Sequence, residues 1–357
     1  MSDIFSRWFK RNFSNPQAVI LTSFIIAIFF FIWMFGQIVM PLLVALVIAY
    51  LLERLVGMLR RMSIPRPVAV VIVFTIFITL SFTILVGIIP LAGKQLENLF
   101  ADLPEMASKF KDMLMALPDK YPGFVTTEQI ESVLQQWGSN FANIGDELVS
   151  FSLESFKGIV TIMIYMILVP LLVFFFMKDK RKIIGWLGKR MPDDTQLSTQ
   201  VWLEVDNQIG AYARGKVIEI FIVGLATYLC FIIFGLNYAL LLAVLVGLSV
   251  LIPYIGATIV TIPVALVALV QWGANDTFAY LMIAYLVIQA LDGNILVPLL
   301  FSETNNLHPV AIIAAVLFFG GIWGVWGVFF AIPLATLVVA VINAFDEVKM
   351  AKSQENS

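Results

Sequence analysis

One acidic residue, Asp292, has the type and the setting that most directly suggest chemistry. It lies inside the apolar run 277–302, in the sequence Ile288-Gln289-Ala290-Leu291-Asp292-Gly293-Asn294. In a membrane-spanning helix a carboxylate costs roughly 2.5–3.5 kcal/mol even on the most lenient insertion scale, so intramembrane acids face partners or water. We therefore predict that Asp292 binds a proton or a cation, with Asn294 as a neighbouring ligand and Gln289 facing the same cavity.

The segment around Asp292 also permits a structural role. Gly293 and Pro298 both interrupt helical hydrogen bonding, so Asp292 can serve as a cap at a helix break. The two interpretations are compatible, because transporters bind ions where helices are broken. A second interruption, Pro253-Tyr254-Ile255-Gly256, offers freed carbonyls to a cation or a polar solute. Its alternative is a tight turn between two short helices.

The last apolar run, residues 304–345, contains two further candidates. Glycines at a spacing of three to four residues let helices approach closely. Here they are Gly320, Gly321, Gly324 and Gly327. Helix packing is our interpretation, with a flexible gate or a re-entrant tip as the alternative. His308 precedes Pro309 and is expected to cap the helix that begins there, with a proton relay as the alternative.

A group of charges stands just before the longest apolar run. The spacing of Val201, Val205, Ile209 and Tyr212 predicts an amphipathic helix on the membrane surface or against the bundle. This helix leads to Lys216 and Glu219. Snorkelling at the mouth of the next span, together with helix termination, accounts for these two charges.

Membrane helices must position all of these residues, because the composition excludes a soluble fold. Hydrophobic residues make up 61% of the 357 residues, charged residues 13%, and the mean hydropathy is +0.95. Soluble domains are about 45–50% apolar and about 25% charged. We therefore predict an all-α polytopic membrane protein, with about eight transmembrane helices, one or two short or re-entrant helices and an external amphipathic helical hairpin.

Several classes of function are excluded at the same stage. The net charge of -2 gives no basic footprint for nucleic acid. With Cys230 as the single cysteine and His308 as the single histidine, neither an intramolecular disulfide nor a zinc site of such ligands is possible. The sequence has no Walker loop, no Gly-x-Ser-x-Gly elbow and no second intramembrane Asp for a protease dyad. We expect no cofactor, no metal and no enzymatic activity.

The windows between charges define the spans. The charge-free runs are residues 18–52, 68–93, 158–177 and 220–275. A spanning helix needs about 20 apolar residues, so the first run must hold two helices, with a break at Gln37 and Pro41. The run 220–275 must hold more than two helices, with breaks at Gly235-Leu236-Asn237 and at the Pro253–Gly256 interruption.

The distribution of Lys and Arg predicts the orientation. An interfacial helix at 1–17, the loop 53–67 within the membrane segment 18–93, and the basic residues 178–190 are expected in the cytoplasm. The acidic segment 94–156 is expected outside. The remaining divisions are a membrane helix at 157–177, a cytoplasmic segment at 178–216, a C-terminal bundle at 217–345 and a tail at 346–357. Both termini are then cytoplasmic, in a multi-pass protein of the cell inner membrane.

The external segment contains two amphipathic stripes. Apolar residues at a spacing of three to four run from Leu96 to Leu117 and from Ile130 to Phe151, with Pro118 and Pro122 at the turn. We expect an antiparallel helical hairpin that continues from the membrane helices. Its stripes pack either within the hairpin or against another subunit.

A series of motifs occurs in order along the C-terminal half of the chain. They are Tyr212-Ala213-Arg214-Gly215-Lys216, Phe234-Gly235-Leu236-Asn237-Tyr238, Leu251-Ile252-Pro253-Tyr254-Ile255-Gly256, Gln289-Ala290-Leu291-Asp292-Gly293-Asn294, Leu307-His308-Pro309, Gly324-Val325-Trp326-Gly327 and Ala331-Ile332-Pro333. This series resembles the autoinducer-2 exporter family, and most closely its PerM-type permeases. Many members of that family carry Glu where this chain has Asp292.

The resemblance implies a function in transport. Members of the autoinducer-2 exporter family have been linked to export of that signal, and others to sodium–proton exchange. Their architecture implies a homo-oligomer, a pentamer. These expectations come from the resemblance and not from the periodicities above.

The sequence leaves three hypotheses. The first is an inner-membrane secondary transporter that moves a small polar solute or cation across the lipid bilayer, with Asp292 as the coupling site. The second is a passive oligomeric pore, in which Asp292 is a selectivity charge. The third is a membrane interaction protein that docks a partner on the 94–156 hairpin.

Overall fold

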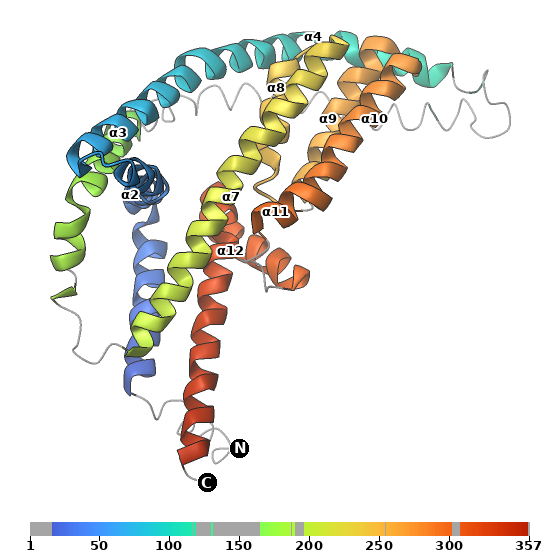
Figure 1. The fold of residues 1–357 in the computed structure, drawn as a ribbon. Helices are drawn as coiled ribbons and strands as arrows, with labels where there is room; N and C mark the ends of the chain where they lie inside the picture. The colour runs from blue at the N-terminus through green and yellow to red at the C-terminus, as the bar shows by residue number, and fades with distance from the viewer. Residues whose placement is uncertain are drawn as a thin grey trace.

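The structure, a computed structural model, describes residues 16–116, 118, 130, 165–186, 188–189, 196–253, 255–301 and 308–355. Throughout this part of the chain the regular elements are helices, which confirms the predicted all-α membrane fold (Figure 1). In the described residues, five helices are long and apolar enough to cross a membrane: Val39–Arg61, Arg66–Met115, Gly210–Phe234, Ile255–Trp272 and Asp276–Phe301. Three shorter apolar helices accompany them: Ala239–Ser249, Val310–Gly324 and Gly327–Val339.

Helix α2 (Pro16–Arg61) contains the break predicted inside the first apolar run. Its backbone leaves helical geometry at Phe35, with φ -114° and ψ 17°, and the helix changes direction there (Figure 1). The break therefore lies two residues before Gln37, and Pro41 is inside the second segment. A proline lacks a backbone N–H and clashes with the preceding turn, so the bend falls on its N-terminal side.

The predicted basic loop 53–67 is mostly helical. Helix α2 continues to Arg61, and helix α3 (Arg66–Thr83) begins after a connection of residues 62–65. Arg60 and Arg61 lie in the last turn of α2, where a positive charge stabilises the helix by interacting with the negative end of its dipole. The loop is shorter than predicted because α2 continues through residues 53–61.

Helix α3 continues without a break into the predicted external segment. A π-helical turn, η1 (Ile84–Ile88), joins it to α4 (Ile89–Met115), so the predicted boundary between residues 93 and 94 falls inside a helix. Leu99 and Met106 of its apolar stripe pack against the core beneath α8 and α9. Figure 1 shows α4 crossing the ends of α8 and α9. Most of the second predicted stripe lies outside the described residues.

Helix α7 (Gln196–Phe234) is the central element of the C-terminal bundle. It contacts α2, α8, α10, α11 and α12. Two helices approach it closely: Gly210 faces the Tyr50 ring of α2, and Gly224 faces Gly247 of α8 (Ala239–Ser249). The predicted division between residues 216 and 217 falls inside this continuous helix, because the amphipathic segment and the span share one backbone.

Helices α8 and α9 (Ile255–Trp272) form a hairpin, called here the tip hairpin. Its two outer ends meet, because Gln271 near the end of α9 accepts from Asn237 N–H at 2.8 Å and donates to Gly235 O at 2.8 Å. Gly235 adopts φ +71°, a conformation that glycine allows without strain. The breaks predicted at Gly235-Leu236-Asn237 and around Pro253 are both confirmed.

Helix α12 (Pro309–Glu355) is two helices joined at a sharp turn. Gly324 has φ 60° and ψ -138°, and the chain folds back so that Gly327 lies against the carbonyl of Phe319. A Cβ at Gly320 would lie 2.8 Å from the Val328 side chain. The close packing predicted for these glycines and the predicted turn-back of the chain therefore occur at the same place in α12. Gly321 has no atom within 4 Å of its Cβ position.

Candidate functional site

Lys216 and Glu219 form a buried ion pair on helix α7. The Lys216 ammonium lies 3.1 Å from Glu219 Oε1 and 2.8 Å from Oε2, and it donates to Val250 O at 2.7 Å. Lys216 is 4% exposed and Glu219 is 2% exposed. Val250 is the C-cap residue of α8. It lies in the turn between Ser249 and Ile255 that joins α8 to α9, called here the tip. A carbonyl three residues before the predicted interruption thus accepts from a cation, and that cation is a lysine of the protein.

The surface role predicted for these two charges is wrong. The apolar segment of α7 begins at Gly210, so both residues lie inside it. Lys216 stands 18 residues before the end of α7, which is about 27 Å at 1.5 Å per residue. Snorkelling requires solvent at the charged end of the side chain, and the α8 tip and α11 exclude it here.

Aromatic packing closes the site on the side of α11 (Val297–Phe301). The Phe301 ring centroid is 5.3 Å from the Lys216 ammonium and 5.6 Å from the Tyr212 ring. Gly215 lets this ring approach, because a Cβ there would lie 2.5 Å from a Phe301 ring carbon. Within this motif, Gly215 provides the surface on which the Phe301 ring packs, and the adjacent Lys216 provides the positive charge.

Asp292 reaches the same region from the end of helix α10 (Asp276–Leu291). It is half-buried and lies 16 residues after the start of α10, about 24 Å along the helix axis. Its carboxylate is in electrostatic range of both Lys216 and Glu219. Oδ1 is fully buried, and no hydrogen-bond donor in the described residues reaches it. Two carboxylates and one ammonium therefore share this site.

The other two predicted ligands bond elsewhere. Asn294 Nδ2 donates to Ala290 O at 2.8 Å, one turn earlier on its own helix. Gln289 Nε2 donates to the Tyr285 hydroxyl at 2.7 Å, and that hydroxyl lies 3.1 Å from Thr261 Oγ1 of α9. The Tyr285 hydroxyl thus joins α10 to α9. Asp292 lies in electrostatic range of Lys216 and Glu219, and its carboxylate makes no hydrogen bond to its two predicted neighbours among the described residues.

The interruption predicted at Gly293 and Pro298 takes the form of a π-helical turn, η2 (Asp292–Leu296). The Val297 N–H donates to Asp292 O, a bond one residue longer than in an α-helix. Pro298 has no N–H to donate in the following turn, which favours this rearrangement. Single π-helical turns are frequent at functional sites, because they free backbone groups and re-aim side chains.

The remaining candidate residues make turn, packing and capping contacts. Pro253 lies in the tip, and its carbonyl accepts from Ile255 N–H at 2.7 Å. Gly256 lies directly against the Ser249 carbonyl, where a Cβ has no room. His308 Nδ1 accepts from Val310 N–H at 3.3 Å, which confirms the predicted cap of the helix that begins at Pro309. Tyr254 lies outside the described residues.

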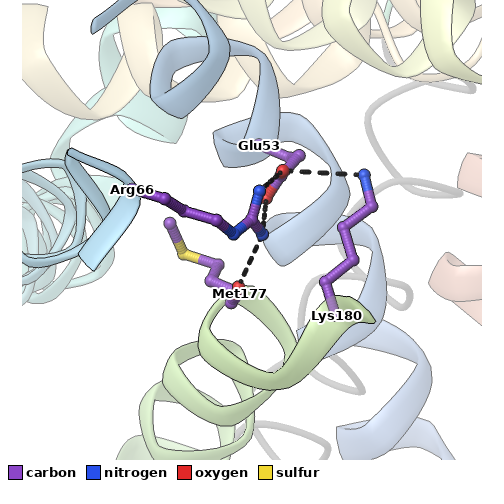
Figure 2. Close-up of polar contacts among 4 residues, drawn as sticks. All are labelled: Glu53, Arg66, Met177 and Lys180. Atoms are coloured by element: carbon purple, nitrogen blue, oxygen red, sulfur yellow. Dashed lines mark hydrogen bonds and ion pairs between the residues drawn. The ribbon is translucent and has the colours of Figure 1, made fainter. Parts of the chain in front are cut away.

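A second polar cluster lies near the beginning of α3. Arg66 donates to both carboxylate oxygens of Glu53, at 2.7 and 3.2 Å, and to Met177 O at 3.0 Å (Figure 2). Lys180 approaches the same carboxylate at 3.7 Å. The cluster joins α2, α3 and the helical residues 165–186. It brings two of the predicted basic segments, 53–67 and 178–190, into contact.

The fold and the site together define a class. Buried ionisable residues at interrupted helices of an apolar bundle are typical of membrane transport proteins. The comparison with known families agrees: the chain belongs to the AI-2E family of transporters, whose sequence model matches residues 22–347.

Curated relatives extend over almost the whole chain. It is 46% identical over 352 residues to "Putative permease PerM" of Escherichia coli (strain K12), covering 99% of this chain and 100% of the relative. It is 26% identical over 338 residues to "Putative transport protein YueF" of Bacillus subtilis (strain 168), covering 92% and 89%. These names describe transport and specify no substrate.

Sequence reasoning missed Lys216 and Glu219 as site residues. Two features of the sequence, taken together, could have identified them. Opposite charges at i and i+3 have the spacing of a helical ion pair. An apolar stretch from Gly210 to Phe234 is also long enough to span with both charges inside it.

Proposed function

We propose that the protein is an inner-membrane secondary transporter that moves a small polar solute or cation, coupled to a proton or sodium gradient through Asp292. The single observation that carries the proposal is the buried Oδ1 of Asp292, which no donor in the described chain reaches, beside an ion pair already formed. A buried acceptor without a partner costs about 1–3 kcal/mol, and more when charged. A proton or a cation removes that cost.

The charge balance of the site supports coupling. Lys216 compensates one carboxylate, and its donors are directed to Glu219 and Val250. Asp292 is the second carboxylate, and its Oδ1 has no hydrogen-bond donor within the described part of the chain. A site that lacks one positive charge binds and releases one in each cycle, which is what coupling to an ion gradient requires.

The interrupted helices support movement at this depth. The tip hairpin, the π-helical turn η2 and the turn of α12 at Gly324 all belong to one bundle, and Ile252 of the tip packs against the α12 core. Breaks in transporter helices mark the place where access alternates between the two sides. The proposed pathway runs past Asp292 between these elements.

The proposed orientation has cytoplasmic termini and an external α4. The contact between Glu53, Arg66 and Lys180 supports it, because two of the predicted cytoplasmic segments, 53–67 and 178–190, meet there. If α4 is external, its contacts with α8 and α9 assign the outer end of the tip hairpin to the same side. A homo-oligomer, a pentamer by family resemblance, remains part of the proposal.

Flux in proteoliposomes tests the proposal. Sodium and proton movements are followed with radioactive sodium and a trapped pH-sensitive dye, under an imposed sodium or proton gradient. Asp292→Asn is expected to abolish gradient-driven flux while assembly, judged by size-exclusion chromatography, is intact. Asp276→Asn at the first turn of the same helix is the matched control and is expected to retain flux.

Two results would contradict the proposal. Gradient-driven flux that is unchanged in Asp292→Asn would show that this carboxylate does not couple transport. Flux that proceeds at the same rate whatever gradient is imposed would indicate a passive pore.

A further inference from the structure

The surroundings of the Lys216 ammonium are those of a bound monovalent cation. Both Glu219 oxygens lie within 3.1 Å, Val250 O lies at 2.7 Å, and the Phe301 ring faces the charge at 5.3 Å. Carboxylate oxygens, a carbonyl at a helix end and an aromatic face all attract small cations. The ligands come from α7, α8 and α11, so three separate elements build this site.

We propose that Glu219, Asp292 and the Val250 carbonyl form a monovalent-cation site that Lys216 occupies as a tethered cation, and that a mobile cation such as sodium displaces the ammonium. This inference rests on the proposed transport function and deepens it, because it names the ligand class and the internal competitor. Glu219 holds the mobile cation together with Asp292, and the ammonium is displaced from Val250.

The charges set the number of cations. Two carboxylates and the Lys216 ammonium leave one negative charge, so one monovalent cation makes the site neutral. A second would give a net positive charge in a region where Lys216 and Glu219 are already more than nine-tenths buried. One cation is therefore bound per chain in each cycle.

Displacement of the ammonium has a consequence for the tip hairpin. The bond from Lys216 to Val250 O joins α7 to the turn between α8 and α9. Lysine carries its charge on a flexible four-carbon stem, so the ammonium can exchange ligands without movement of the α7 backbone. Loss of this bond frees the tip, which links cation binding to the conformation of the broken helices.

A purely structural ion pair makes a different prediction. If Lys216 only stabilises the bundle, its removal weakens folding and weakens or leaves unchanged the binding of any cation. If Lys216 competes with the mobile cation, its removal strengthens binding. The direction of the change in affinity therefore separates the two roles.

The experiment measures sodium binding to the purified full-length protein in choline buffer, by radioactive sodium in an equilibrium assay. Lys216→Gln and Lys216→Met are expected to bind sodium about tenfold or more tightly than the wild type, because a nearby positive charge is removed. Glu219→Gln is expected to bind at least about tenfold more weakly, because a carboxylate is lost. Lys109→Met, at an exposed pair with Glu105, is the control and leaves affinity unchanged.

Hydrogen–deuterium exchange on the wild type adds a measurement that needs no variant. Sodium is expected to increase exchange of the backbone at residues 250–256 relative to choline, because the tip loses its bond to Lys216. Unchanged exchange there, or sodium affinity in the Lys216 variants equal to or weaker than the wild type, would overturn the inference. Gradient-driven flux that requires Asp292 would then still support the proposed function, whereas absence of such flux in the wild type would contradict that function itself.

Discussion

Replacing Lys216 with methionine leaves Glu219 and Asp292 together without their cation in a region nearly closed to solvent. The expected loss in the free energy of unfolding is about 3–5 kcal/mol, the range for taking one partner out of a buried ion pair. The burial supports this range, since Lys216 is 4% exposed and Glu219 is 2% exposed. The lost bond to Val250 O at 2.7 Å contributes in the same direction.

Replacing Glu219 with glutamine is expected to cost less, about 1.5–3 kcal/mol, the scale of one hydrogen bond to a charged group. Lys216 keeps Val250 O as an acceptor and has Asp292 in electrostatic range. In the double variant neither buried charge of the pair remains. The double variant is therefore expected to lose less free energy of unfolding than the two single variants together, by about 2 kcal/mol, which is within the range seen for residues in contact.

Denaturant unfolding in detergent micelles, followed by tryptophan fluorescence, measures these differences. The buffer contains choline in place of sodium, because a mobile cation would compensate the carboxylates in the Lys216 variant. Lys109 and Glu105 provide the matched control pair, with the same residue types at 2.8 Å but with side chains 54% and 68% exposed. Each control variant is expected to change stability by at most about 0.5 kcal/mol. Additive losses in the double variant, or a Lys216 variant as stable as the control, would refute the reasoning.

Two further predictions concern other parts of the bundle. Gly215→Ala is expected to reduce stability by about 1–3 kcal/mol in the same unfolding assay, because its Cβ would lie 2.5 Å from a ring carbon of the buried Phe301. Gly57→Ala, with no atom within 4 Å of its Cβ position, is the control, and equal losses in both variants would contradict the packing argument. Burial, followed by the hydrogen bond with Asp102, raises the pKa of Tyr238 from 10.0 to about 12. The neutral hydroxyl is favoured in the folded state, so its contribution to stability is complete below pH 10 and is lost as the pH rises through about 12. Tyrosinate absorbance, compared between the wild type and Tyr238→Phe, is expected to place this step near pH 12, and a midpoint near 10 would disprove the burial argument.

Much of the fold follows from features that a sequence displays locally. Glycine and proline interrupt helical hydrogen bonding wherever they occur, so the ends of α7 and α8 were predictable from Gly235 and Pro253. Asp292 was detectable for a related reason. A single charge in a long apolar run stands out against its neighbours without knowledge of any contact.

The partners of a residue are not a local property. Lys216 and Glu219 follow a basic segment, and the same pattern describes charges at a membrane surface. Their burial depends on Val250 and Phe301, which are 34 and 85 positions from Lys216 along the chain. The amphipathic stripe of α4 likewise predicted an apolar partner but did not specify α8 and α9.

The outer end of the tip hairpin restricts how the hairpin can move. Gln95 of α4 accepts from Leu241 N–H at 2.8 Å, and Gln271 fixes Asn237 at 2.8 Å, so this end acts as a pivot. Val250, at the far end of α8, lies 11 residues after Ala239, a lever arm of about 16 Å at 1.5 Å per residue. A rotation of about 10° around the pivot moves Val250 by about 3 Å, the length of a hydrogen bond. A rotation this small separates Val250 from Lys216 while both helices remain intact.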